Sequence, residues 1–386
     1  MKKKSIFTLC MAIAITTVAQ QEIKNKKNGN YTFTIVKNLE ATGVQNQAKS
    51  STCWSFSSLS FIESELIRMG KPSVNLSEMF VVHHAYTDKA EKFVRMHGNT
   101  TFAPGGGFHD ALYVMKKYGI VPQSVYSGMA NGEKELNHFQ MDNMLRGMVE
   151  GVIAPQKETT ISDGWQKAID ATLDAYLGKL PETFDYNGKQ YTPSSFAASL
   201  GIDYTNYIEI TSYTHHPFYT KFILEIPDNW MWDEVHNVPL NELVDVIDNS
   251  ILSGYSVAWG ADVGEPGFSF KDGIAVVPDL DWKDIKKEKI DSVVNHPGKQ
   301  KEITQAMRQK SFDNYETTDD HGMHIVGIAK DQNGTKYYIV KNSWGTTRNE
   351  CGGYFYVSEA YLKYKTTSIM INKESLKKEQ AKKLGL

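Results

Sequence analysis

Residues 47–56 read QAKSSTCWSF, and this segment determines how the rest of the chain is interpreted. From Cys53 onward, apolar side chains recur at the spacing of one helix face as far as Ile67, and Gly70 follows where a helix is expected to end. The pattern predicts an amphipathic helix with Cys53 in its first turn. A helix N-terminus lowers the pKa of a thiol, and the thiolate is the form that attacks a carbonyl. Cys53 is therefore a candidate nucleophile, although a free cysteine considered alone is more often a buried structural residue.

Three further side chains complement Cys53 in the way that acyl transfer requires. Gln47 supplies a hydrogen-bond donor for a developing oxyanion, and the backbone N–H of Cys53 supplies a second one. Far downstream, the string DHGMHIVG contains His321 as a candidate base, and the string KNSWG contains Asn342 as an amide that can orient an imidazole. The sequence thus holds a nucleophile, a base, an orienting group and an oxyanion donor.

These three segments, in this order, resemble the active-site signatures of the papain family of cysteine peptidases. The resemblance implies that Cys53 is the nucleophile, His321 the base and Asn342 its orienter. It further implies that Gln47 completes the oxyanion hole and that Trp344 shields the contact between His321 and Asn342 from water. The implied fold is α+β, with a helical lobe that carries the nucleophile facing a β-rich, barrel-like lobe. The implied reaction is amide hydrolysis of peptides through a thioester, without a metal or an organic cofactor.

His324 is a second candidate for the base, three residues after His321. Successive side chains of a strand face opposite ways, so a strand that begins near His321 turns the two imidazoles to opposite faces. The family pattern places Val326 and Gly327 at a fixed offset from its histidine, and that offset selects His321.

The spacing of the segments departs from papain. His321 and Asn342 lie 268 and 289 residues after Cys53, whereas papain-type enzymes place them about 130 to 150 residues after the nucleophile. More than a hundred residues are therefore inserted. The bleomycin hydrolase or aminopeptidase C branch carries such insertions, and further strings resemble that branch at residues 76–78, 88–93, 106–110, 117–122 and 259–264.

Membership of that branch carries implications for substrate binding. Gly106 and Gly107 should lie along the cleft and pair with the main chain of a substrate, although a tight turn is the alternative for two glycines. The C-terminal arm, residues 373–386, should enter the cleft so that the carboxylate of Leu386 meets the ammonium of a substrate, although a frayed end is the alternative. The branch also implies cleavage from a free amino terminus and a ring-like homo-oligomer, a hexamer.

The remaining organisation follows from residue patterns. Helices are predicted near residues 77–93, 111–118 and 165–177, and strands near 256–262, 325–329, 336–340 and 353–357. The predicted division is a signal peptide at 1–19, a helical lobe at 20–125, an inserted mainly helical subdomain at 126–240, a β-rich lobe at 241–372 and the arm at 373–386.

The start of the chain has the layout of a secretory signal. Lys2, Lys3 and Lys4 precede a mostly apolar run at 6–18, and Ala19 offers a small residue for cleavage. A membrane anchor is the alternative, but this run is shorter than the roughly 20 residues that span a bilayer. We therefore expect export to a periplasm or to the outside of the cell, without stable membrane insertion after cleavage. The net charge of −3 gives no basic surface for nucleic acid.

Other reactive residue types are interpreted as structural. The pairs His83–His84 and His215–His216 lack an acidic or second histidine partner at the spacing of a zinc motif, so no metal site is predicted. Cys351 is expected to be a small buried residue. Two rival functions remain open at this level: an unrestricted endopeptidase, and a catalytically silent binding protein on the same fold.

Overall fold

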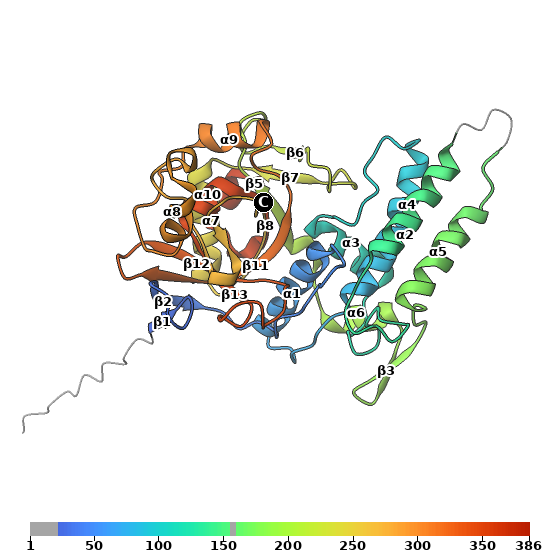
Figure 1. Ribbon diagram of the computed structural model, residues 1–386. Helices are drawn as coiled ribbons and strands as arrows, with labels where there is room; N and C mark the ends of the chain where they lie inside the picture. Colours follow the sequence, from blue (N-terminus) through green and yellow to red (C-terminus); the bar gives the residue numbers. More distant parts are fainter. Residues whose placement is uncertain (1–21, 155–159) are drawn as a thin grey trace, which may run out of the picture.

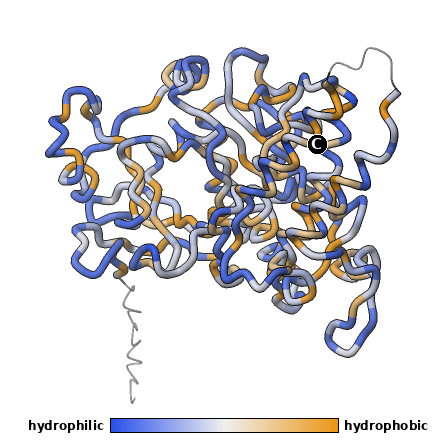
Figure 2. The backbone as a smooth tube through the Cα atoms, turned by 45° about the vertical axis from the view of Figure 1, so that its right-hand side comes forward, coloured by the Kyte–Doolittle hydropathy of each residue, from blue (hydrophilic) through white to orange (hydrophobic). Residues whose placement is uncertain are grey.

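The computed structural model describes residues 22–154 and 160–386. The predicted signal peptide at 1–19, with Cys10, lies outside these residues. Helices gather on one side of the molecule and a large sheet on the other (Figure 1). Hydrophobic segments run mostly through the interior of both halves, while many outlying loops are hydrophilic (Figure 2). Within the described ranges, no helix has the length and apolar character needed to cross a membrane.

The helical half forms where the sequence predicted helices. The first helix begins at Cys53. The second helix is capped by Ser77, whose side chain accepts a hydrogen bond from the N–H of Phe80. The third helix begins at Phe108, three residues before its predicted start, because the Asp110 carboxylate accepts a hydrogen bond from the N–H of Gly107. The helices of this half are α1 (Cys53–Arg68), α2 (Glu78–Arg95), α3 (Phe108–Tyr118), α4 (Phe139–Ile153), α5 (Gly164–Leu177) and α6 (Pro193–Leu200).

The other half is built on a twelve-stranded sheet. Its main path runs β6-β7-β5-β14-β8-β11-β12-β13-β10-β9, while β2 pairs with β11 and β1 with β2. The strands are β1 (Glu22–Lys24), β2 (Thr32–Asn38), β5 (Tyr207–Thr211), β6 (Lys221–Ile223), β7 (Glu234–Asn237), β8 (Val257–Ala261), β9 (Phe268–Ser269), β10 (Ile274–Ala275), β11 (His321–Asp331), β12 (Lys336–Lys341), β13 (Tyr354–Ser358) and β14 (Thr366–Asn372). The flanking helices are α7 (Leu240–Leu252), α8 (Lys287–Val294), α9 (Gln305–Asp313) and α10 (Glu359–Lys365), and a hairpin of β3 (Phe184–Tyr186) and β4 (Lys189–Tyr191) lies apart.

One predicted boundary differs from the structure. Residues 126–240 were expected to form a mainly helical insertion, yet β5, β6 and β7 fall in this range and belong to the large sheet. β5 pairs with β14 over four residues, so the sheet half begins well before residue 241. The three strands are only three to five residues long, which leaves too few alternating positions for a strand pattern to be recognised.

The C-terminal segment packs on the outside of the sheet half. A short turn at Lys373–Ser375 and helix α11 (Lys378–Lys383) follow β14. Lys383 forms an ion pair of 2.6 Å with Glu242 of α7. Leu384 is buried among apolar residues of the sheet half. The segment is thus fixed against α7.

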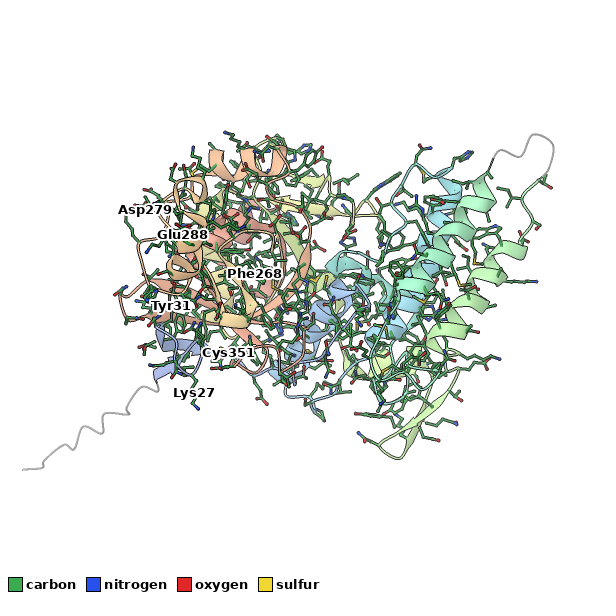
Figure 3. The ribbon with its side chains drawn as sticks, viewed as in Figure 1. Lys27, Tyr31, Phe268, Asp279, Glu288 and Cys351 are labelled. Carbon is green, nitrogen blue, oxygen red and sulfur yellow. The ribbon has the colours of Figure 1, made fainter. Side chains whose placement is uncertain are left out.

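Cys351 has a structural role in this half. Its Sγ donates a hydrogen bond of 2.7 Å to the carbonyl oxygen of Asn25, and it packs partly buried in the apolar cluster of Tyr31, near the N-terminal strands (Figure 3). The sequence analysis expected a small buried residue, and Cys351 is in fact partly buried.

The two halves meet along a buried polar seam between α1 and strands β11 and β12. Lys341 donates hydrogen bonds of 3.0 Å to Thr42 and 2.8 Å to Ser60. Glu63 and Glu78 line the same cavity as Lys341. Burial, followed by the charge of Glu63, raises the pKa of Glu78 to about 8. Glu78 is therefore mainly protonated in the folded protein at neutral pH.

This seam predicts a pH-dependent effect of Glu78→Gln. The folded protein retains a proton that the unfolded chain releases between the ordinary glutamate pKa and about 8, so the contribution of Glu78 to stability falls as pH rises through that window. Glutamine removes this dependence, and we expect the gain in Tm over wild type to be larger at pH 8 than at pH 5, by a few degrees. Thermal unfolding at both pH values measures it.

The control is Glu288→Gln on the exposed surface of α8 (Figure 3). Its Tm difference from wild type should be small and the same at both pH values. A loss of Tm for Glu78→Gln that is equal at pH 5 and pH 8 would contradict the prediction.

Candidate active site

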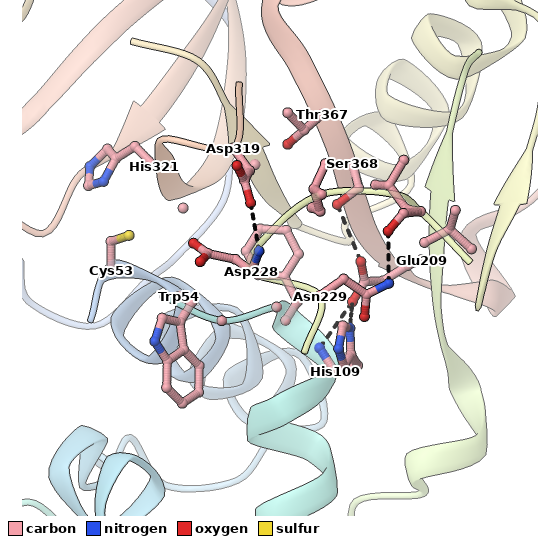
Figure 4. A pocket seen from close by; sticks show the side chains of 18 residues that line it. Cys53, Trp54, His109, Glu209, Asp228, Asn229, Asp319, His321, Thr367 and Ser368 are labelled. Atoms are coloured by element: carbon pink, nitrogen blue, oxygen red, sulfur yellow. Dashed lines mark hydrogen bonds and ion pairs between the residues drawn. The ribbon is translucent and has the colours of Figure 1, made fainter. Parts of the chain in front are cut away.

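A cavity between the two halves brings together residues that are far apart in the sequence (Figure 4). Cys53 enters it from the first turn of α1, and His321 enters it as the first residue of β11. Gly106 and Gly107 form part of its wall. The described hydrogen bonds include none between Cys53 and His321, as is common in catalytic sites without substrate.

The imidazole of His321 is held from two sides. Its Nε2 lies 2.7 Å from Oδ1 of Asn342, which follows directly after β12. The same oxygen accepts a hydrogen bond from the backbone N–H of Ser343, so the amide orientation is fixed with its oxygen toward the ring. An acceptor at that position places the proton on Nε2 and leaves Nδ1 able to accept a proton.

Trp344 covers this pair. Its ring stacks on that of His321 with centroids 4.7 Å apart, and the rings of Phe268 and Phe270 pack edge-on against it. The structure therefore places an apolar lid over the contact between His321 and Asn342.

In the site without substrate, the thiol of Cys53 and the imidazole of His321 are both neutral. Burial raises the pKa of Cys53 to about 11, the charge of Asp228 raises it further, and the N–H groups of Gly322 and Trp54 act in the opposite direction. Burial lowers the pKa of His321 to about 4, while the hydrogen bond that it donates to Asn342 acts in the opposite direction. In the free site, burial thus outweighs the hydrogen bonds that favour the charged forms of both groups. A neutral imidazole beside a neutral thiol suits a base that removes the thiol proton as attack begins.

Gln47 is oriented by a residue that the sequence analysis did not single out. Ser343 donates a hydrogen bond of 2.6 Å from Oγ to Oε1 of Gln47, and the Gln47 N–H donates to the Ser343 carbonyl at 2.8 Å. Because its oxygen is occupied, the Nε2 of Gln47 is the donor that remains, and it has no partner within the described part of the chain. Ser343 stands next to Asn342 in the string KNSWG, and this adjacency was the signal that could have identified it.

His324 faces away from the cavity, as strand alternation predicts. Its Nδ1 lies 2.9 Å from Oγ of Ser60 on α1, and the ring is buried in the polar seam. The position of His321 in the cavity and of His324 in the seam separates the two candidate bases.

The two glycines lie where a peptide main chain could approach. A Cβ on Gly106 would lie 3.0 Å from the Trp54 ring and would overlap the Asp110 carboxylate, so no side chain fits there. Gly107 is extended, with φ −96° and ψ 169°. An extended, half-buried segment without side chains on the cavity wall suits main-chain pairing with a substrate.

Leu386 does not reach the cavity. It is 47% exposed at the end of the segment that packs on α7, and its N–H donates to the carbonyl of Ala381. Among the described residues, none of 373–386 lines the cavity. The prediction that this terminus lies in the cleft is therefore not met in this structure.

A loop that the sequence analysis did not identify occupies part of the cavity wall instead. We call residues 224–233, between β6 and β7, the bridging loop. Trp230 donates a hydrogen bond of 2.6 Å to Asp110, and Lys92 donates one of 2.9 Å to the carbonyl of Met231. Through these contacts the loop extends from the sheet half to α2 and α3. Leu224, Ile226, Asp228 and Asn229 line the cavity.

The pair His215–His216 gains an acidic neighbour that its spacing did not reveal. The Nε2 atoms of the two rings each lie 3.0 Å from an oxygen of Glu225. Gln309 donates through its Nε2 to Nδ1 of His215 at 3.0 Å, so Nε2 of His215 carries the proton that faces Glu225. The three side chains form a hydrogen-bonded surface cluster, and their potential ligand atoms lie within 4.8 Å of one another.

Comparisons with known proteins bear on the family and the fold of the chain. A model of the Peptidase C1-like family matches residues 2–385. The chain is 26% identical over 383 residues to Aminopeptidase C of Lactococcus lactis subsp. cremoris, covering 87% of this chain and 82% of that protein. It is 22% identical over 426 residues to Aminopeptidase G of Lactobacillus delbrueckii subsp. lactis, covering 98% and 91%. The crystal structure of PepW from Lactobacillus rhamnosis HN001 superposes with a TM-score of 0.71 at 21% identity, covering 91% of this chain and 84% of that one, which confirms the α+β fold.

The orientation of Gln47 predicts the effect of removing its side chain. Gln47→Ala deletes the free Nε2 donor, and we expect kcat to fall about 10²- to 10³-fold on a peptide substrate, since one oxyanion donor contributes that much. Alkylation of Cys53 by iodoacetamide should stay near the wild-type rate. Gln45→Ala is the matched control, because its side-chain oxygen accepts a hydrogen bond from Gln123, whereas that of Gln47 accepts one from Ser343. An equal loss of kcat in both variants would refute the assigned role.

Proposed function

This chain belongs to the Peptidase C1-like family, and on that premise we propose that it is a cysteine-type aminopeptidase that cleaves peptides from a free amino terminus. The observation that carries the proposal is the contact of His321 Nε2 with Asn342 Oδ1 at 2.7 Å, made by a histidine that lines the same cavity as Cys53. That arrangement leaves Nδ1 of His321 as the proton acceptor nearest the chemistry. The named aminopeptidases to which the chain is similar along most of its length support the exopeptidase assignment.

In the first half of the proposed reaction, each of these residues has a defined role. His321 takes the thiol proton at Nδ1 while the sulfur of Cys53 bonds to the substrate carbonyl carbon. The resulting oxyanion accepts hydrogen bonds from Gln47 Nε2 and from the backbone N–H of Cys53. When the C–N bond breaks, the imidazolium of His321 gives its proton to the leaving amine, and a thioester remains.

The second half of the reaction restores the site. His321 takes a proton from water as the water oxygen adds to the thioester carbonyl. Collapse of this second tetrahedral adduct breaks the C–S bond, and the proton returns to sulfur. Asn342 holds the ring in one tautomer throughout, and Trp344 keeps water from competing for that hydrogen bond.

Two rivals are distinguished by experiment. An unrestricted endopeptidase would have an open cleft, whereas the bridging loop crosses beside the glycine segment in this structure. A catalytically silent binding protein would not need the complete set of Cys53, His321, Asn342 and Gln47. We therefore favour the aminopeptidase over both.

The test uses aminoacyl-coumarylamides in free and N-acetylated forms. Wild type should cleave the free form at least about a hundredfold faster in kcat/KM, and Cys53→Ala should cleave neither. Because Leu386 lies on α7, deletion of residues 385–386 should leave this preference unchanged. Equal cleavage of both forms by wild type would make the protein an endopeptidase, and no cleavage together with no alkylation of Cys53 would favour the silent binding protein.

Export and assembly complete the proposal. The layout of residues 1–19 supports secretion to the periplasm or the cell exterior, with no stable membrane insertion after cleavage and no affinity for nucleic acid.

The family resemblance supports a hexameric ring, and α4 carries the exposed apolar side chains Phe139 and Met144 that association would cover. Light scattering of the purified protein should give about six times the mass of one chain, and the mass of a single chain would exclude the ring.

A further inference from the structure

Three carboxylates line the cavity of Cys53, and their surroundings differ. Glu209 accepts hydrogen bonds from the N–H and the Nδ1 of His109, at 3.0 and 2.8 Å. Asp319 accepts a hydrogen bond of 3.0 Å from the backbone N–H of Asp228. The carboxylate of Asp228 itself has neither a hydrogen bond nor an ion pair with any described residue. It is the carboxylate in this cavity that lacks a partner.

The position of Asp228 relates it to the reacting atoms. A Cβ on Gly105 would overlap its carboxylate, so Asp228 lies directly against the start of the glycine segment that lines the cavity. Its charge reaches Cys53, where it raises the pKa of the thiol. Figure 4 shows the carboxylate directed toward the side of Cys53 and away from His109. A substrate whose main chain follows the glycines towards Cys53 would meet Asp228 where its chain begins.

The bridging loop holds this carboxylate rigidly. Nδ2 of Asn229 donates hydrogen bonds of 3.0 Å to the carbonyls of Leu224 and Asp233, and its Oδ1 accepts from the Asp233 N–H at 2.9 Å. The ring of Trp232 packs beneath the Lys92 ammonium at 4.0 Å, which adds a further contact with α2. A preformed loop of this kind binds a ligand without a large ordering cost.

The surroundings of Asp228 indicate what kind of group would pair with its carboxylate. A half-buried carboxylate without an ion pair is unfavourable. Burial, followed by the charge of Asp319, raises the pKa of Asp228 to about 7, although the charge of Lys89 acts in the opposite direction. A cation with N–H donors would remove this penalty through charge-assisted hydrogen bonds. The one cation that a peptide always brings to an aminopeptidase is its α-ammonium group.

We propose that Asp228, on the bridging loop, binds the α-ammonium of the substrate and so makes the site select free amino termini. This inference rests on the proposed function and adds the residue that determines its specificity. It gives to a side chain of the cavity wall the role that the sequence analysis assigned to the terminal carboxylate of Leu386. The loop also obstructs the path that a longer chain would take past Gly105.

The experiment compares wild type with Asp228→Asn on the free and N-acetylated coumarylamides. The neutral amide keeps the shape of the side chain and removes its charge. We expect kcat/KM for the free form to fall about 10- to 100-fold, as for loss of a hydrogen bond to a charged group, while the acetylated form is cleaved as in wild type or faster. Asp279→Asn, which makes the same charge change on the far surface (Figure 3), should leave both values unchanged.

Alkylation of Cys53 by iodoacetamide shows whether the variant keeps an intact site. It should be no slower in Asp228→Asn than in wild type, because removal of a nearby negative charge favours the thiolate. If the variant does not fold, Asp228→Glu replaces it. The displaced carboxylate should then weaken cleavage of the free form and leave the acetylated form unaffected.

The outcomes separate the two proposals. If wild type prefers the free form and an intact Asp228→Asn keeps the same preference, the role of Asp228 is refuted and the aminopeptidase stands. If Asp228→Glu is used instead, unchanged cleavage of the free form by that variant also refutes the role of Asp228. If wild type cleaves both forms equally, the aminopeptidase assignment itself fails.

Discussion

The close packing of α1 against β11 is the contact on which the catalytic arrangement depends. Cys53 and His321 belong to different halves, and this contact brings the elements that carry them together. A Cβ on Gly322 would lie 2.6 Å from Oγ of Ser57 and 3.4 Å from the carbonyl of Cys53, so the strand approaches the helix as closely as it does because residue 322 is glycine. The buried seam of Lys341, Ser60 and Thr42 then holds the two elements together one layer below the cavity.

The parts of the site that the sequence revealed are those that local pattern encodes. Cys53 could be assigned because the motif around it accompanies a helix start, and strand alternation showed that His321 and His324 face opposite ways. The choice of His321 came from the family offset to Val326 and Gly327. The order of the three motifs identified the family, and with it the α+β fold. The helices of the first 120 residues followed from apolar periodicity with small errors at their ends, as for α3, whose start is fixed by the contact of Gly107 with Asp110.

What the sequence did not reveal depends on contacts between distant segments. Nothing in residues 224–233 marks a loop that crosses to α2, because its partners Lys92 and Asp110 are more than a hundred positions away. The placement of Leu386 failed for a similar reason, since a buried Leu384 and an ion pair with Glu242 decide where the C-terminal segment lies. The short strand β5 acquires its place through pairing with β7 and with β14, which lies more than 150 residues further along the chain.

The position of β14 has a consequence for how the chain folds during synthesis. This strand lies between β5 and β8 inside the sheet, although it comes from residues 366–372, close to the C-terminal end of the sequence. A ribosome releases a chain from its N-terminus onward, so the sheet stays divided until almost all of the polypeptide has emerged. The nascent chain therefore has no complete cavity and no active thiol site while it is being made. Such delayed closure keeps a peptidase inactive during translation.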